Sequence, residues 1–520
     1  SSTAEISTAS STDVTATDSV QPVAGTPDEQ PASDPESSPY SPESWFQTAP
    51  IGYAENGVYI NGYDVMITGF NTDAPGFDGN IVVPPTIDGH RVAGIGIDGG
   101  RWSWLGTILS VLTLGIPDMV DISDSNPDPG PLCVIPIDGA KEVKSLDLTY
   151  CDDGIIIKQS AFGVNTPICG TNFYRCSNLK TLKLPNNAIV EESAFRNSGL
   201  TSIECGSNCY FYEGAFYDCG DLSSVGDLIN CDIDYKAFGN CKNLSSVGSL
   251  SGSIIKKQAF YHCEGLESID LTGCTPIYGC PFSIGEKAFD SCKNLSSVSG
   301  LSGQTIGEQA FYHCENLKSV GDLTDCKLGK KAFDTCKNLD SVGSLSGSSI
   351  GEQAFYHCDS LESINLTGCT SIDKKAFDSC KNLSSVSGLS GQTIGEQAFY
   401  HCENLKSVGD LTDCKLGKKA FDTCKNLDSV GSLSGSSIGE QAFYHCENLQ
   451  SVGDLAGCTS IGKKAFDTCK KLASVEDISD CTIGEQAFYH CENLKSVGNL
   501  TNCKLGNKAF DTCENLSSIG

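Results

Sequence analysis

Basic residues are scarce in this chain. Lys and Arg number 35 against 65 Asp and Glu, which gives a formal net charge of −30 at pH 7. A surface of that sign repels the phosphates of nucleic acids and of anionic lipids. The composition therefore excludes nucleic acid and an anionic membrane surface as partners.

The sequence also lacks a hydrophobic run long enough to cross a membrane. The best candidate, WLGTILSVLTLGIPDMV (104–120), is interrupted by Gly106, Gly115, Pro117 and Asp118. A spanning helix needs about 20 consecutive apolar residues. We expect no membrane insertion. No secretory leader is evident, so the sequence is interpreted as mature or trimmed.

Catalytic and cofactor-binding motifs are missing too. We find no phosphate-binding loop, serine elbow or catalytic cysteine motif, and the repeats contain no C-x-x-C pair of the kind that binds zinc. The acidic loop of Asp121, Asp124 and Asp128 lacks the Gly and Glu of a calcium-binding hand, which favours a solvated loop. The chain is predicted to be no enzyme and to bind no cofactor or metal.

Three regions differ in composition. Residues 1–48 are rich in Ser, Thr and Pro and carry eight acids but no Lys or Arg, so we predict a disordered linker there. Residues 49–142 are interpreted as a β-rich N-terminal capping unit, and residues 143–520 as a repeat array.

The array is defined by a phenylalanine that recurs at a nearly fixed interval. Of the fifteen steps between successive members, twelve are 22 residues long and the others are 21, 29 and 23. A fixed period of this size indicates a solenoid, in which each coil buries its apolar face against its neighbours. The sixteen members are Phe173, Phe195, Phe216, Phe238, Phe260, Phe289, Phe311, Phe333, Phe355, Phe377, Phe399, Phe421, Phe443, Phe466, Phe488 and Phe510.

The residues after each phenylalanine follow the leucine-rich-repeat pattern L-x-x-L-x-L-x-x-N/C. The segment from Leu179 to Asn187 and the segment from Leu361 to Cys369 are two examples. The alternating L-x-L portion predicts a short strand with one buried face. The predicted fold class is an α/β repeat solenoid, with a parallel sheet on one side and irregular or short helical or β turns on the other.

The full repeat, I-G-x-x-A-F-x-x-C-x-x-L-x-x-I, resembles the BspA-like leucine-rich-repeat family of bacterial and protist surface proteins, from about residue 160 to 520. Residues 62–96 resemble the β-rich unit that often opens such arrays. The 22-residue coil is slightly short for the family, and the proline after the strand is often missing. The resemblance implies a cell-surface adhesin for host or neighbouring-cell proteins, with fibronectin and fibrinogen among the family's ligands.

The chain contains 29 cysteines, and most occupy two repeated positions. Fifteen lie three residues after the repeat phenylalanine. Nine more are assigned to the N/C position of the strand motif, where Asn187 and Asn208 are taken as equivalents. Free cysteine behaves as a small buried hydrophobe, so we predict buried rows of free thiols, Cys314 and Cys336 among them.

A few cysteines are predicted to lie outside these positions. They are the better candidates for disulfides or exposed thiols: Cys133, Cys169, Cys209 and Cys280.

Successive coils alternate in charge, so the pattern repeats every 44 residues. Three residues before the phenylalanine, acid and base alternate: Glu308, Lys330, Glu352, Lys374, Glu396, Lys418, Glu440, Lys463 and Glu485. The position four after the phenylalanine alternates likewise, from Glu315 and Lys337 onward. Equivalent residues of stacked coils are neighbours, so we interpret the pattern as a charge ladder that favours stacking. A charged recognition strip is the alternative.

A candidate partner-binding strip follows the buried Ala–Phe pair in alternate coils. Tyrosine is enriched in interfaces, and repeats about 10 Å apart suit a repetitive partner. The alternatives are that tyrosine merely covers its own coil, or that the sheet face binds through Lys318, Asp340, Glu362 and Lys406. The strip consists of Tyr312, His313, Tyr356, His357, Tyr400, His401, Tyr444 and His445.

These observations predict a non-enzymatic, extracellular or cell-surface protein that binds a host-matrix or neighbouring-cell protein. The alternative is a structural surface protein, a stalk, surface layer or filament built from stacked coils. The sequence stops in mid-repeat at NLSSIG without a polar capping unit. We expect the natural chain to continue, or self-association through the uncapped coil.

Overall fold

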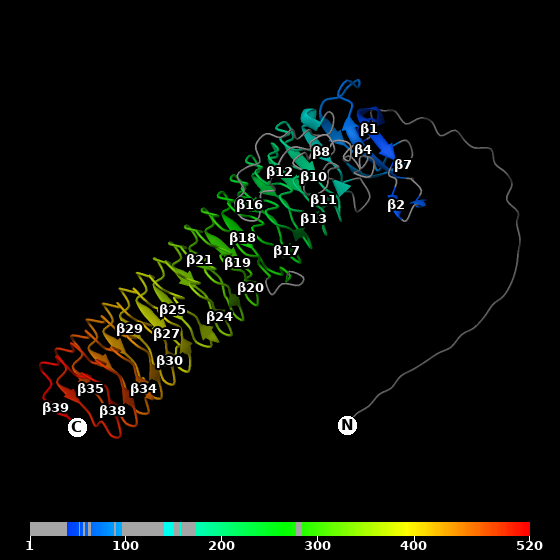
Figure 1. Ribbon diagram of the computed structural model, residues 1–520. Helices are drawn as coiled ribbons and strands as arrows, with labels where there is room; N and C mark the ends of the chain where they lie inside the picture. Colours follow the sequence, from blue (N-terminus) through cyan, green and yellow to red (C-terminus); the bar gives the residue numbers. More distant parts are fainter. Residues whose placement is uncertain are drawn as a thin grey trace, which may run out of the picture. The chain divides into compact units, whose positions relative to one another are not determined.

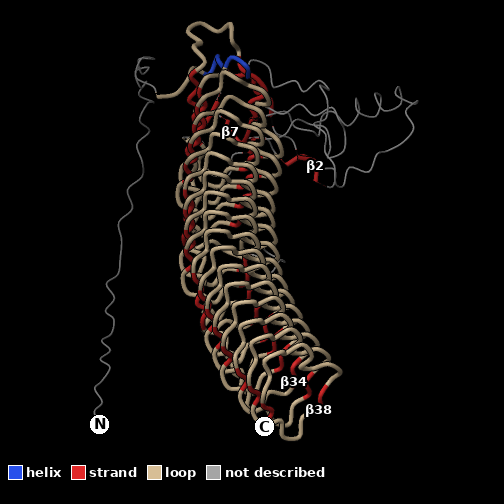
Figure 2. The backbone as a smooth tube through the Cα atoms, turned by 90° about the vertical axis from the view of Figure 1, so that its left-hand side faces the viewer, coloured by secondary structure: helices blue, strands red, loops and turns tan. Residues whose placement is uncertain are grey.

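The computed structural model describes residues 39–50, 53–55, 58–60, 64–87, 90–95, 140–149, 156–157, 173–276 and 283–520. The described residues from Tyr40 to Gly520 belong to one compact unit. Within Tyr40–Gly520, short coils are stacked one behind another (Figure 1 and Figure 2). The acidic loop of Asp121, Asp124 and Asp128 lies outside the described residues, as do Cys133, Cys151, Cys169 and Cys280.

Each coil of the solenoid contributes one short strand to each of two parallel ladders. The first ladder contains the strand just before the repeat Ala–Phe pair, and the bridges Ile255–Ile284 and Ile284–Ile306 connect its two sheets. It runs through β1 (Phe46–Pro50), β4 (Asp64–Phe70), β7 (His90–Ile95), β9 (Ile156–Ile157), β11 (Ile189–Val190), β13 (Tyr210–Phe211), β15 (Asp232–Ile233), β17 (Ile254–Ile255), β20 (Thr305–Ile306), β22 (Lys327–Leu328), β24 (Ser349–Ile350), β26 (Ser371–Ile372), β28 (Thr393–Ile394), β30 (Lys415–Leu416), β32 (Ser437–Ile438), β34 (Ser460–Ile461), β36 (Thr482–Ile483) and β38 (Lys504–Leu505).

The second ladder holds the predicted L-x-L strands and is divided into three consecutive sheets. Its valines and isoleucines point inward, and its serines face outward, as in Ser363–Asn365. It runs through β5 (Asn80–Val82), β8 (Ser145–Asp147), β10 (Thr181–Lys183), β12 (Ser202–Glu204), β14 (Ser224–Val225), β16 (Ser246–Val247), β18 (Ser268–Asp270), β19 (Ser297–Ser299), β21 (Ser319–Val320), β23 (Ser341–Val342), β25 (Ser363–Asn365), β27 (Ser385–Ser387), β29 (Ser407–Val408), β31 (Ser429–Val430), β33 (Ser451–Val452), β35 (Ser474–Val475), β37 (Ser496–Val497) and β39 (Ser518–Ile519).

The predicted parallel sheet and solenoid are thus confirmed, but the α/β description needs correction. Among the described residues, helix is limited to two 3-10 turns, η2 (Glu43–Trp45) and η4 (Ala140–Glu142). In the coils, residues on either side of the Ala–Phe pair adopt the left-handed conformation, such as Gln309 (φ 56°) and His313 (φ 56°). This conformation prevents a helix, and the backbone instead bonds to the next coil, as Phe311 N–H does to the Ala332 carbonyl at 2.8 Å.

The N-terminal strands extend both ladders. Strand β7 pairs with β9 and β5 pairs with β8, both in parallel. At the start of the first ladder, β1 pairs with β4 in the antiparallel direction. The short strands β2 (Tyr53–Glu55), β3 (Val58–Ile60) and β6 (Thr86–Ile87) also form antiparallel pairs. Trp45 and Phe46 are buried, so the end of the segment predicted as a linker, residues 43–48, belongs to this folded unit. Residues 1–38 of that segment lie outside the described part of the chain.

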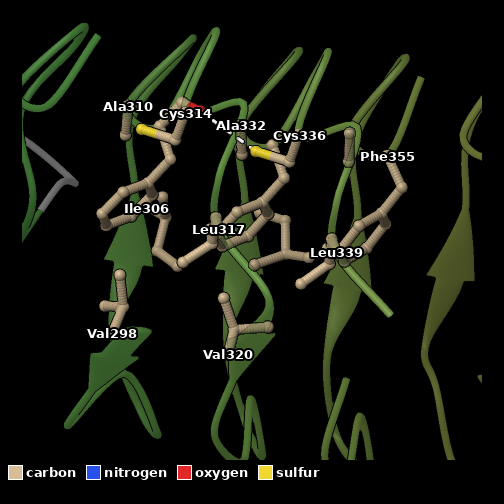
Figure 3. Packing of buried hydrophobic residues seen from close by; sticks show 14 of the residues in the cluster. Val298, Ile306, Ala310, Cys314, Leu317, Val320, Ala332, Cys336, Leu339 and Phe355 are labelled. Atoms are coloured by element: carbon tan, nitrogen blue, oxygen red, sulfur yellow. Dashed lines mark hydrogen bonds between the residues drawn. The ribbon is translucent and has the colours of Figure 1, made fainter. Parts of the chain in front are cut away.

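A continuous stack of phenylalanine rings forms the centre of the core. Successive repeat phenylalanines from Phe173 to Phe510 have ring centroids 5.0–5.3 Å apart and planes within 12° of parallel. The spacing follows from the strand separation of about 4.8 Å, with a small offset that suits stacked aromatic rings. Phe70 lies beyond the end of the stack, with its ring centroid 6.2 Å from that of Phe173 and its plane tilted by 47°. Figure 3 shows how alanine, cysteine, leucine and valine form parallel rows beside the rings.

We expect Phe377→Ala to lower the free energy of unfolding by about 3–5 kcal/mol, since it removes a fully buried ring from between two others. Phe510→Ala is the matched control, because Phe510 is only partly buried and contacts one neighbouring ring. Urea unfolding followed by circular dichroism measures both. Equal losses for the two variants would contradict the stacked core.

Candidate functional site

The residues of the predicted strip lie on one edge of the solenoid, directly after the buried phenylalanines. Tyr312, Tyr356, Tyr400 and Tyr444 are half-buried, as are the histidines that follow them. Tyr312 packs against the His313 ring with centroids 3.9 Å apart, and Tyr356 lies 4.3 Å from His357. Pairs of this kind recur in every second coil, about 10 Å apart at strand spacing.

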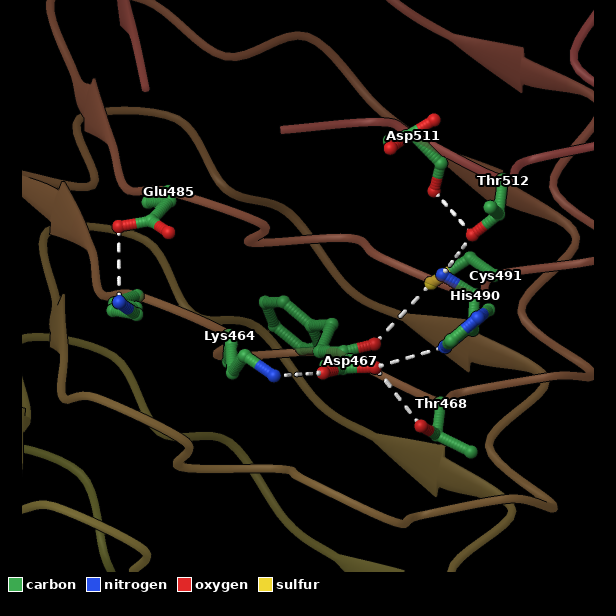
Figure 4. Close-up of polar contacts among 10 residues, drawn as sticks. Lys464, Asp467, Thr468, Glu485, His490, Cys491, Asp511 and Thr512 are labelled. Atoms are coloured by element: carbon green, nitrogen blue, oxygen red, sulfur yellow. Dashed lines mark hydrogen bonds and ion pairs between the residues drawn. The ribbon is translucent and has the colours of Figure 1, made fainter. Parts of the chain in front are cut away.

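Buried aspartates separate the tyrosines. The coil between two tyrosines places Asp334, Asp378, Asp422 or Asp467 at the same position, and each residue is only 2–3% exposed. The Asp334 carboxylate accepts a hydrogen bond from the Thr335 hydroxyl at 2.7 Å and lies 3.3 Å from the Lys331 ammonium. Asp467 has the equivalent partners Lys464 and Thr468, and His490 Nδ1 lies 3.6 Å away (Figure 4).

The same lysines cover the tyrosine rings. Lys331 Nζ is 5.7 Å from the centroid of the Tyr312 ring, and Lys419 Nζ is 5.8 Å from that of Tyr400. These distances are within the range of a cation–π contact. Lysine and histidine thus both lie against the rings of Tyr312 and Tyr400, and these tyrosines are half-buried.

Burial changes the acidity of Asp378, one of these aspartates. Desolvation raises the pKa of Asp378, while the Ser379 hydroxyl, Lys375 and His401 partly oppose this effect. The sequence interpretation missed the aspartates. Their recurrence at the tyrosine position of alternate coils was the available signal, but it gave no indication of burial.

The competing sheet face is more exposed than the tyrosine strip. Lys318, Asp340, Glu362 and Lys406 are all exposed and lie one residue before the strands of the second ladder. Their backbone groups are fixed by the neighbouring coil, as Lys318 N–H is by the Ser296 carbonyl at 3.0 Å. The sheet face therefore has a regular hydrogen-bonded backbone, and its charged side chains vary from coil to coil.

The predicted charge ladder is confirmed, and the structure shows how it connects the coils. Lys418 pairs with Glu440 of the following coil at 3.2 Å, whereas Lys425 pairs with Glu403 of the preceding coil at 3.2 Å. Other lysine-bearing coils repeat this arrangement, as at Lys374–Glu396 (3.3 Å) and Lys381–Asp359 (3.7 Å). Each exposed pair contributes only about 0–1 kcal/mol, but from Glu308 to Glu485 the alternation keeps like charges apart.

The cysteines three residues after each phenylalanine form a buried row, as predicted. From Cys219 to Cys513, each thiol donates a hydrogen bond to the phenylalanine carbonyl of the preceding coil, with sulfur–oxygen distances of 3.1–3.3 Å. Cysteine supplies a donor for this internal carbonyl while remaining mostly apolar. All 25 cysteines in the described part of the chain are free.

Two assignments at the other cysteine position were wrong. Cys209 precedes β13 just as Cys231 precedes β15, so it belongs to the repeated row. Asn187 (φ 57°) and Asn208 (φ 60°) lie one residue earlier, in the left-handed turn where Gly252 and Asp325 stand in other coils. Asparagine, aspartate and glycine recur at this turn because they tolerate positive φ.

Nothing in the described coils assembles a metal or nucleophilic site. No group of three or more His, Cys, Asp or Glu side chains among the described residues is arranged to hold a metal ion. The thiol after each Tyr–His pair is buried, and burial raises the pKa of Cys314 well above its ordinary value. Among the described residues, no helix has the length and apolarity of a membrane span.

The fold and the repeat define a leucine-rich-repeat solenoid. The family model for the BspA type leucine rich repeat region matches residues 156–267, 229–340, 253–384, 304–428 and 414–520. These ranges cover more than half of the chain, and the chain therefore belongs to the BspA-type leucine-rich-repeat family. No curated protein matches the sequence.

Several solved structures are similar in fold. A leucine-rich repeat protein from Bacteroides ovatus ATCC 8483 is 18% identical, with 91% of this chain and 92% of that chain covered and a TM-score of 0.37. A leucine rich cell surface protein from Faecalibacterium prausnitzii A2-165 is 18% identical, with 68% and 89% covered and a TM-score of 0.27. An internalin from Listeria monocytogenes is 11% identical, with 66% and 81% covered and a TM-score of 0.24.

Because these thiols are buried, we expect the free energy of unfolding to fall at alkaline pH. Burial raises the pKa of Cys219 and Cys263 from the ordinary 9.0 to about 12. Between these values the unfolded chain releases thiol protons that the folded chain retains, so the free energy of unfolding falls as pH rises, by about 1.4 kcal/mol per pH unit for each such thiol. Thermal unfolding between pH 8 and 11 measures the effect. Constant stability from about pH 9 upward would contradict it.

Proposed function

We propose that the chain is a non-enzymatic extracellular or cell-surface scaffold that binds a protein partner. The observation that supports this most is the fixed register of the coils, which aligns equivalent positions of successive coils along each face over residues 173–276 and 283–520. Arrays of this kind present extended binding surfaces. A host-matrix or neighbouring-cell protein is the partner that the family resemblance favours.

The tyrosine strip is the proposed contact surface. Its aromatic groups are held in place by histidine and lysine, so little side-chain entropy is lost when a partner binds. Repetition at two-coil spacing allows a repetitive partner to make several equivalent contacts, and linked contacts raise the overall affinity. The sheet face, defined by Lys318, Asp340, Glu362 and Lys406, is the competing surface.

Replacing the four tyrosines of the strip by serine is expected to weaken binding at least tenfold, because the aromatic contact area is lost. The partner is first captured from host-matrix and neighbouring-cell extracts with the unaltered chain, and its Kd is then measured by surface plasmon resonance. Full affinity in the tyrosine variant would exclude the strip as the binding surface.

A second variant serves as the matched control. It replaces Lys318, Asp340, Glu362 and Lys406 by serine, and we expect it to retain affinity if the strip binds the partner. Urea unfolding of both variants separates a loss of contacts from a loss of folding, since the tyrosines also contact Lys331 and Lys419.

The structural alternative, a stalk or filament of stacked coils, predicts self-association. Size-exclusion chromatography with light scattering over increasing concentration distinguishes the two functions. A monomer at high concentration contradicts the structural function and leaves the scaffold function in place.

A further inference from the structure

Two exposed tyrosines distinguish the first coils from the rest of the array. Tyr210 is 49% exposed and Tyr212 is 47% exposed, and outside the final coil they are the exposed large hydrophobic side chains of the described residues. Tyr210 lies on β13 and Tyr212 directly follows the strand, so the two exposed side chains flank the buried Phe211. Along a strand, side chains two residues apart are separated by about 6.6–6.8 Å.

Carboxylates surround these two rings on the neighbouring coils. Strand pairing places Asp232 beside Tyr210 on the following coil, and Asp234 continues the row beside Tyr212. Glu191 occupies the corresponding position on the preceding coil, after β11. Glu213 follows Tyr212 directly in the chain. The aromatic pair therefore lies within a negatively charged surface.

One cation already present shows how this surface binds positive charge. Lys256 lies one coil beyond the aspartates, and its ammonium is 3.0 Å from Asp232 Oδ1 and 2.9 Å from Asp234 Oδ2. The carboxyl groups of Glu213 and Glu192, on the coils before the aspartates, are affected by burial and by nearby negative charges. Partial burial and the negative charges of Glu192 and Asp234 raise the pKa of Glu213, and burial raises the pKa of Glu192.

The later coils cannot present the same surface. Where Tyr212, Asp234 and Lys256 stand in the first coils, most later coils have glycine. At Gly417, an added Cβ would lie 2.7 Å from the backbone nitrogen of Glu396, which is closer than a side chain allows. The first coils are thus built differently at this position, and the difference produces an aromatic and acidic surface instead of a bare backbone.

We propose that Tyr210 and Tyr212, with Glu191, Glu213, Asp232 and Asp234, form a docking site for an extended peptide with basic residues at alternate positions. Lysine or arginine side chains of an extended peptide have the same two-residue spacing as the tyrosines. Each cation is attracted to a tyrosine face and to the adjacent carboxylates. No set of acidic side chains in the described residues converges on a metal site, which favours an organic cation. This site is separate from the tyrosine strip and the sheet face, so it stands or fails independently of the proposed function.

The test uses a synthetic peptide in which lysine alternates with serine, titrated into the full chain and followed by fluorescence anisotropy. We expect binding that is lost when glutamate replaces the lysines. Replacing Tyr210 and Tyr212 together by serine is expected to weaken it roughly tenfold, the loss of one or two cation–π contacts. Serine occupies the Tyr210 position in β24 and β32, so the variant fits the strand.

Two further variants make the result specific. Glu213→Gln removes one charge next to the tyrosines and is expected to weaken binding severalfold, while Tyr356→Ser, on the tyrosine strip, is expected to leave it unchanged. Equal binding by the doubly substituted chain and the unaltered chain would overturn the proposal. Absence of peptide binding, or binding of neutral polysaccharide at this site in its place, would overturn it as well.

Discussion

The structure depends on one constraint: each coil lies in register on the next, so equivalent positions of successive coils are neighbours. Strand separation sets that spacing at about 4.8 Å, and the phenylalanine rings follow it with centroid separations of 5.0–5.3 Å. The same register brings the Cys336 thiol to the Phe311 carbonyl at 3.3 Å. A residue that packs well against itself, or against the backbone of the previous coil, is therefore favoured in every coil.

Charged residues are the exception, because identical charges on neighbouring coils repel each other. Lysine above lysine would repel, and the chain resolves this by alternating two kinds of coil, which doubles the period to 44 residues. Lys418 and Lys425 then connect their coil to the next and to the previous one. The alternation also shapes the proposed tyrosine strip, because it separates the tyrosines by buried aspartates such as Asp422.

Much of the fold could be predicted from the sequence, because the repeat period indicates which residues lie next to each other in stacked coils. The phenylalanine core, the thiol row and the charge ladder all followed from spacing alone. The spacing of the repeats does not indicate the backbone conformation of each residue. The left-handed residues Gln309 and His313 exclude a helical turn, which was one of the predicted alternatives. The left-handed turn occupied by Asn187 was mistaken for the position of the repeated cysteines, and Cys209 was therefore misassigned. Burial of Asp334 was missed for a related reason, since its environment is made by Lys331 and Thr335 of its own turn and by neighbouring coils.

The most direct test compares deletion of 44 residues with deletion of 22. Removing 331–374 joins Lys330 to Lys375 and preserves the alternation of coils, whereas removing 331–352 preserves the phenylalanine stack but places Lys330 beside Lys374 and Glu315 beside Asp359. Thermal unfolding by circular dichroism should show that the longer deletion retains the melting temperature better than the shorter one, with salt raising that of the shorter deletion. A shorter deletion that is as stable as the longer one, with no response to salt, would contradict the account.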